Sequence, residues 1–205
     1  MGMTKSPMKV LAVFGSSHGQ AESVLRRVAA ALEDAGHTVE LHDGERLPRK
    51  LNVNDFDAVV VAASIILGRH QAAIREFVQR HKTALDARPT AFISINGASP
   101  ESDPKWQEAA RGYLEGFLRQ TGWTPRWTES FAGALRYRSY GLVTRRLIKL
   151  ISWQAGGPTD TSRDYEFTDW EAVDRFAATL VTGFASAGGS RGGGRRGKAR
   201  GTGKT

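Results

Sequence analysis

The clearest indication of the fold lies in residues 10–21, VLAVFGSSHGQA. A short apolar run ends at Phe14, a loop rich in glycine and serine follows, and apolar residues then recur at helical spacing until Gly36. This order predicts a strand, a loop and a helix. The loop would bring backbone N–H groups and hydroxyls to the positive end of the helix dipole, which makes it a candidate site for phosphate or another anion.

The same alternation of extended and helical patterns continues along the chain. Further strands are predicted at 38–41, 58–63, 91–95 and 127–132, and further helices at 74–85, 106–118 and 169–184. Thr168 is the expected N-cap of the last helix, and the irregular connection 44–54 indicates that one crossover helix is short or missing. The pattern predicts an α/β fold, a doubly wound five-stranded parallel sheet with helices on both faces. The predicted domain spans 8–187, with 134–167 as an insertion after the fifth strand.

The positive charge is concentrated at the C-terminus. The chain has 205 residues and a formal net charge of +8, but six basic residues and no acidic residue lie in 188–205, which leaves +2 for the rest. This glycine-rich tail is predicted to be disordered, because it has too few apolar residues to form a core. Its G-x-G-x-x-G spacing at 192–197 follows no strand, so we attribute it to composition. No specific nucleic-acid partner is predicted, although attraction of the tail to RNA or anionic lipid stays open.

Several function classes lose support from the composition. The absence of cysteine excludes disulfides, thiolate nucleophiles and Cys-ligated metals. The five histidines show no metal-binding spacing, and no G-x-S-x-G motif indicates a hydrolase. We therefore expect no metal, and no catalytic acid or base can be assigned. No run of about 18 apolar residues occurs, which predicts a soluble or peripheral protein.

Two more loops follow predicted strands and belong to the same candidate site. In a doubly wound sheet, ligands bind beyond the carboxyl ends of the strands. Residues 63–70 (ASIILGRH) and 94–98 (SINGA) end apolar strands with small residues, as expected of loops that lie against a flat ring. The candidate cofactor-binding residues of the three loops are Ser16, Ser17, His18, Gly19, Gln20, Ser64, Ile65, Gly68, Ser94, Ile95, Asn96 and Gly97.

The order of these loops resembles that of flavodoxins. More specific motifs follow the fifth predicted strand: FAGALRY (131–137), LIKLI (147–151), GG (156–157), TDT (159–161) and TDWE (168–171). They are similar to the insertion and the final helix of the flavodoxin-like, menaquinone-dependent protoporphyrinogen IX dehydrogenase family. The resemblance covers about residues 8–185.

This resemblance implies a function and a cofactor. It implies FMN, with its phosphate on the first loop and its isoalloxazine ring between the other two. It implies oxidation of protoporphyrinogen IX to protoporphyrin IX in haem biosynthesis, with a membrane quinone as electron acceptor. It further implies a cytoplasmic enzyme, peripheral on the cytoplasmic face of the inner membrane.

The insertion adds a cluster of cations to the predicted site. Residues 136–153 contain five basic residues and no acidic residue. Arg136, Tyr137 and Arg138 are candidate substrate-binding residues, since arginine binds carboxylates such as propionates through paired hydrogen bonds. Trp106, Tyr137 and Tyr140 are candidates for stacking on a ring. If 142–153 is helical, it is amphipathic, and its apolar face either lies at a membrane surface or packs on the sheet.

Two other functions stay open. A flavin or quinone reductase with another electron donor would share the three loops but would not need the basic insertion. A nonenzymatic flavodoxin-like binding protein, tethered to RNA or lipid by its tail, is the third interpretation. It is favoured by Ala21 and Leu67, which stand where the family has threonine and an aromatic residue.

Overall fold

The protein is built around a central parallel sheet. The computed structural model describes residues 7–96, 103–135, 146, 160–162 and 164–189. Five strands pair in parallel in the order β2-β1-β3-β5-β6, which confirms the predicted α/β architecture. They are β1 (Lys9–Gly15), β2 (Thr38–Asp43), β3 (Ala58–Ile66), β5 (Thr90–Asn96) and β6 (Trp127–Ala132).

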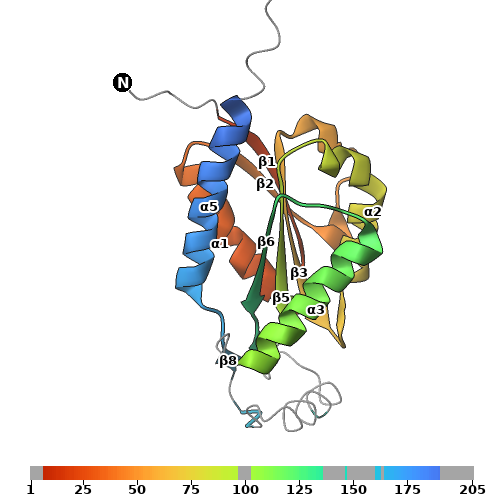
Figure 1. Cartoon of the computed structure of the whole chain (residues 1–205), viewed down its shortest axis with the longest axis vertical. Helices are drawn as coiled ribbons and strands as arrows, with labels where there is room; N and C mark the ends of the chain where they lie inside the picture. Colours follow the sequence, from red (N-terminus) through yellow and green to blue (C-terminus); the bar gives the residue numbers. More distant parts are fainter. Residues whose placement is uncertain (1–6, 97–102, 136–145, 147–159, 163, 190–205) are drawn as a thin grey trace, which may run out of the picture.

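Helices cover both faces of the sheet, as predicted. Helices α1 (Gln20–Asp34) and α5 (Trp170–Gly189) lie side by side on one face, and α2 (Ala72–Asp86) and α3 (Pro104–Thr121) cover the other (Figure 1). The connection after β2 contains only two 3₁₀ turns, η1 (Gly44–Arg46) and η2 (Val53–Asp55), so the missing crossover helix is confirmed.

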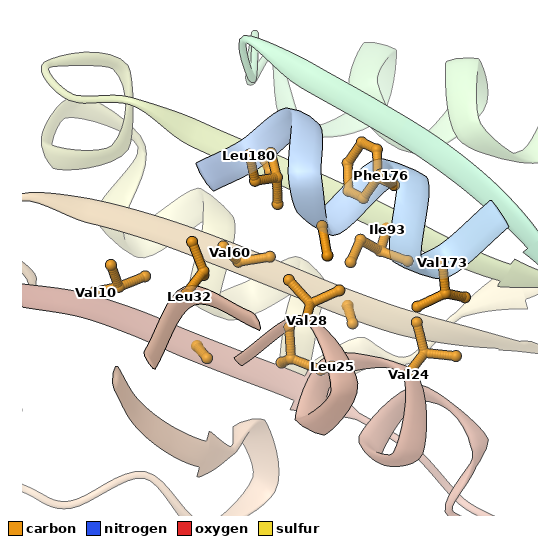
Figure 2. Close-up of a cluster of buried hydrophobic side chains, with 14 of the residues drawn as sticks. Val10, Val24, Leu25, Val28, Leu32, Val60, Ile93, Val173, Phe176 and Leu180 are labelled. Carbon is orange, nitrogen blue, oxygen red and sulfur yellow. The ribbon is translucent and has the colours of Figure 1, made fainter. Parts of the chain in front are cut away.

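Each face of the sheet has its own apolar core, because successive strand residues point to opposite sides. On the α1 and α5 side, Val10 of β1, Val60 of β3 and Ile93 of β5 pack against both helices (Figure 2). On the α2 and α3 side, Phe92 stacks on Phe117 with ring centroids 4.5 Å apart. The three central strands are therefore buried on both faces, which explains their continuous apolar runs.

The end of β3 differs from the sequence prediction. Instead of a loop after Ala63, β3 continues to Ile66 and turns back as the short antiparallel strand β4 (Arg69–His70). The two turn residues, Leu67 and Gly68, both have positive φ, at 49° and 76°. This backbone geometry matches the right-handed twist of a two-residue hairpin. Leucine seldom adopts it, so no sequence signal indicated the turn.

The cap of α5 also differs from the prediction. The carboxylate of Asp169 accepts a hydrogen bond from the backbone N–H of Ala172 and so caps the helix. Thr168, the predicted cap, is buried and donates its hydroxyl to the carbonyl of Ala132 at 2.7 Å. The threonine therefore ties the start of α5 to the end of β6.

A small second sheet stands at the two ends of the predicted insertion. Strand β7 (Ala134–Leu135) pairs with β8 (Tyr165–Glu166) in antiparallel fashion. One backbone bond extends this pairing, since Phe167 N–H donates to the carbonyl of Gly133 at 3.1 Å. A second bond, from Gly133 N–H to the carbonyl of Asn96 at 3.3 Å, continues the pairing of β6 with β5. The chain thus leaves and re-enters the domain at neighbouring points beside the end of β5.

Two glycines in helices should respond in opposite ways to alanine. A Cβ on Gly183 of α5 would lie 2.3 Å from Cζ2 of Trp127, whereas a Cβ on Gly112 of α3 meets no described residue within 4 Å. We expect Gly183→Ala to lower the free energy of unfolding by about 1–2 kcal/mol through overpacking. We expect Gly112→Ala to raise it by about 0.5–1 kcal/mol, because alanine favours the helix. Urea unfolding of both variants tests this, and a gain in both would contradict the contact with Trp127.

Candidate functional site

Three chain segments meet at one edge of the sheet. Strands β1, β3 and β5 are neighbours and parallel, and their ends are in register, with Gly15 beside Ala63 and Ala63 beside Ser94. The loops that follow these strands therefore leave from the same edge. Strand β2 lies on one side of β1, and β3 and the later strands lie on the other. The strand order therefore reverses between β1 and β3, and this type of fold binds ligands at that point.

The first loop has the features of an anion site. Gly19 adopts the left-handed conformation and precedes α1, which begins without a side-chain cap. The hydroxyl oxygen of Ser16 is buried and has no hydrogen-bond partner among the residues that the structure describes. His18 is half-buried in the same loop. A buried, unsatisfied hydroxyl is costly, and a phosphate oxygen at the start of α1 would satisfy it.

Gln71, which no sequence pattern indicated, contacts the first loop from the side opposite α1. It precedes α2 and donates from Nε2 to Oγ of Ser17 at 2.7 Å. A Cβ on Gly15 would lie 2.3 Å from Oε1 of Gln71 and 2.5 Å from Cγ1 of Ile74, so only glycine fits there. Gln71 belongs to no sequence motif. It reaches the first loop only because the β3–β4 hairpin places the start of α2 beside that loop.

The second loop is the hairpin between β3 and β4. Ser64 and Ile65 belong to β3 and are half-buried, and Gly68 is an exposed turn residue. Leu67 is 73% exposed although it is apolar and held at positive φ. Tyr113 of α3 lies beside the turn, since a Cβ on Gly68 would be 3.8 Å from its ring. The hairpin thus presents an apolar tip next to the site.

The third loop begins with side chains that are buried. Ser94 is fully buried, and its hydroxyl lies 2.9 Å from Nε2 of His70, so it is paired within the protein. Ile95 packs in the core on the α1 and α5 side. The side-chain nitrogen of Asn96 is buried and lacks a partner in the described part of the chain. Asn96 is therefore the residue of β5 best placed to donate a hydrogen bond to a ligand carbonyl.

His70 is a buried neutral histidine that joins the hairpin to β5. It is 8% exposed, and its ring contacts Phe117 with centroids 4.9 Å apart in an edge-on arrangement. Burial lowers the pKa of His70 from 6.5 to about 4, because the charged form would lose its hydration. His70 is thus uncharged at neutral pH and holds Ser94 from the hairpin side.

Two residues predicted to contact a ligand have their polar side-chain groups committed to the protein. Gln20 is 4% exposed, and its Nε2 donates to Thr168 at 2.8 Å and to Glu166 at 3.1 Å. The indole N–H of Trp106 donates to the carbonyl of Asn96 at 2.9 Å, and the ring is 9% exposed. Trp106 therefore packs from α3 against Ala132 of β6 and Phe167 as a core residue. No local pattern could have shown the Gln20 contacts, because their partners lie at the other end of the chain.

Several sequence predictions fall on residues outside those described. They include Gly97 of the third loop, the substrate-binding candidates Arg136, Tyr137 and Arg138, Tyr140, and the tail from residue 190 onward. Of the predicted amphipathic segment 142–153, only Arg146 is described, and it is exposed and helical. Within the described ranges, no cluster of His, Asp and Glu side chains could hold a metal ion. No described helix is long and apolar enough to cross a membrane.

The fold and its loops define a flavodoxin-type protein. A family model described as a flavodoxin domain matches residues 11–162. The solved structure of flavodoxin 1 from Bacillus cereus has the same fold, with a TM-score of 0.51 at 15% identity over 85% of this chain and 97% of that one. The flavodoxin domain supports FMN as the cofactor, and the first loop offers its phosphate an unsatisfied hydroxyl and a helix start without a side-chain cap.

Sequence relatives identify the family more narrowly. The protoporphyrinogen IX dehydrogenase [quinone] of Escherichia coli (strain K12) is 35% identical over 174 residues, which cover 85% of this chain and 95% of the relative. The protein of the same name from Leishmania major is 32% identical over 183 residues, covering 87% and 77%. The chain therefore belongs to the quinone-dependent protoporphyrinogen IX dehydrogenase family, which is a family of oxidoreductases.

Proposed function

We propose that this protein uses FMN to oxidise protoporphyrinogen IX to protoporphyrin IX and passes the electrons to a membrane quinone of the menaquinone type. The observation that carries the proposal is the 35% identity to the Escherichia coli enzyme over 95% of that enzyme's length. A match of this extent includes the insertion as well as the flavodoxin core. The reaction would be a step of haem biosynthesis.

The first and third loops supply the groups that would hold the cofactor. Ser16 and the backbone at the start of α1 would bind the phosphate, and the amide of Asn96 would donate to a ring carbonyl. Ala21, where the family has threonine, is fully buried in the core, so a hydroxyl there would face the sheet rather than the loop. When bound, FMN would accept electrons from the substrate and pass them on to the acceptor.

The chain itself would orient the porphyrinogen and balance its charge. We propose that Arg136 and Arg138 bind propionate carboxylates and that Tyr137 packs on the tetrapyrrole. Hydrogen atoms leave the porphyrinogen in pairs, each as two electrons and two protons, and each pair converts one quinone to one quinol, so several quinones are consumed for each porphyrin formed. Because a prenylated quinone resides in the bilayer, we propose peripheral contact with the cytoplasmic face of the inner membrane through 142–153 and the basic tail.

The proposal predicts flavin uptake and quinone-dependent turnover. Purified protein mixed with FMN should show the absorbance of bound flavin after desalting. It should then oxidise protoporphyrinogen IX without oxygen when a menaquinone analogue is added. Arg136→Ala and Arg138→Ala should raise KM for the porphyrinogen severalfold with little change in FMN affinity, because carboxylate contacts are lost. Arg119→Ala, on the exposed face of α3, is the matched control.

Each outcome separates the alternatives. Flavin binding without porphyrinogen oxidation would reject the substrate and favour a flavin or quinone reductase with another donor. Unchanged kinetics in both arginine variants would reject their role in binding propionates. Failure to bind flavin at saturating FMN would overturn the proposal as a whole.

A further inference from the structure

The side chain of Gln20 connects two parts of the protein that are far apart in sequence. Gln20 is the first residue of α1, directly after the first loop, and its amide is buried. Nε2 donates to the hydroxyl of Thr168 at 2.8 Å and to the carboxylate of Glu166 at 3.1 Å. A bond to a charged acceptor is stronger than one between neutral groups, so this contact restrains both partners.

The acceptors of Gln20 are themselves held in place. Thr168 is bound to the main sheet, because its hydroxyl donates to the carbonyl of Ala132 at the end of β6. The same carboxylate oxygen of Glu166 also accepts from the indole N–H of Trp170 at 3.0 Å. Glu166 and Thr168 are thus fixed relative to both β6 and α5, and Gln20 joins this unit to the first loop.

Glu166 belongs to the small sheet at the base of the insertion. We call residues 133–135 and 165–168 the base ribbon; it contains the paired strands β7 and β8. The ribbon is also bonded to the third loop, where Gly133 N–H donates to the carbonyl of Asn96. The ribbon therefore contacts two of the three loops of the site, one through a side chain and one through the backbone.

We infer that Gln20 is a positioning residue that couples occupation of the first loop to the stability of the base ribbon. This rests on the proposed function, in that the FMN phosphate is the anion that fills the loop. A phosphate bound at the start of α1 restricts the backbone of Gln20, and its side chain restricts the ribbon. Such coupling is reciprocal, so an ordered ribbon strengthens FMN binding by the same factor.

Hydrogen exchange of the ribbon amides tests the coupling in the full-length protein. FMN should slow exchange at residues 133–135 and 165–168 about tenfold in the wild type, within the usual range of coupling between sites. Riboflavin, which lacks the phosphate, should protect the ribbon far less. In Gln20→Ala the protection by FMN should fall below about threefold, and FMN affinity should fall with it.

Two further variants make the test specific. Arg26→Ala removes the Arg26–Glu22 ion pair, which lies within α1 on its exposed face, and should retain the full response to FMN. Gln20→Glu keeps the size of the side chain but replaces the donor with a carboxylate facing Glu166, so it should behave as Gln20→Ala does. Equal protection by FMN in the wild type and both Gln20 variants would overturn the inference alone. A wild type that binds no FMN would overturn the proposed function and the coupling together.

Discussion

Lowering the pH from 7.5 to 4.5 should destabilise the protein by roughly 2.5 kcal/mol through His70 alone. The folded protein holds the pKa of this buried ring at about 4, whereas a histidine in the unfolded chain titrates near 6.5. Between these values the unfolded chain binds a proton that the folded protein does not. Stability therefore rises with pH across this window, and it is lost as the pH falls.

The measurement is urea unfolding at both pH values, for the wild type and for His70→Gln. Glutamine keeps a polar partner for the Ser94 hydroxyl but does not titrate. The carboxylates and the other histidines whose pKa is lowered by burial, His37 and His81, are the same in both proteins, so the difference between the two pH effects isolates His70. Equal losses of stability in wild type and variant would show that His70 is not held in its neutral form.

Gly15→Ala should weaken FMN binding at least about tenfold and lower the free energy of unfolding by about 2–3 kcal/mol. The added Cβ would lie within 2.5 Å of Cγ1 of Ile74, which is fully buried and cannot move without disturbing the core. The same Cβ would displace the side chain of Gln71, which bonds Ser17 in the first loop. The phosphate loop would thus lose a support together with the backbone position at its start.

Gly112→Ala provides the control for this second prediction, since its Cβ lies within 4 Å of none of the residues that the structure describes. FMN affinity is read from flavin fluorescence titration, and stability from urea unfolding of the protein without flavin. If Gly15→Ala binds FMN as the wild type does, Gln71 does not support the loop in the way its contact suggests. If stability alone is unchanged, Ile74 adapts to the methyl group at no cost.

The sheet was predictable because burial on both faces makes its central strands continuously apolar. Strands covered on both faces must be apolar throughout, and 58–63 and 91–95 were recognised for this reason. The β3–β4 hairpin was missed because its turn residues are Leu67 and Gly68, where hairpins usually have asparagine or aspartate before glycine. The cap of α5 was placed one residue early because Thr168 and Asp169 are both good caps, and only tertiary contacts distinguish them.

The sequence predicted where the three loops of the candidate site lie better than it predicted the hydrogen bonds of their side chains. Parallel neighbouring strands bring their ends to one edge, so the three loops could be placed together from the order of elements alone. The pairing of Ser94 with His70 and of Gln20 with Glu166 joins residues that no local pattern relates. Side chains predicted to face a ligand can therefore have partners inside the protein, and only their three-dimensional arrangement reveals it.

The insertion begins and ends at two paired strands, because Ala134 pairs with Glu166 and Leu135 with Tyr165. Because the outgoing and returning chains are hydrogen-bonded neighbours, a tight turn between Leu135 and Tyr165 would close the domain as well as a long excursion does. Evolution can consequently lengthen, shorten or exchange the intervening segment without altering any register in the main sheet.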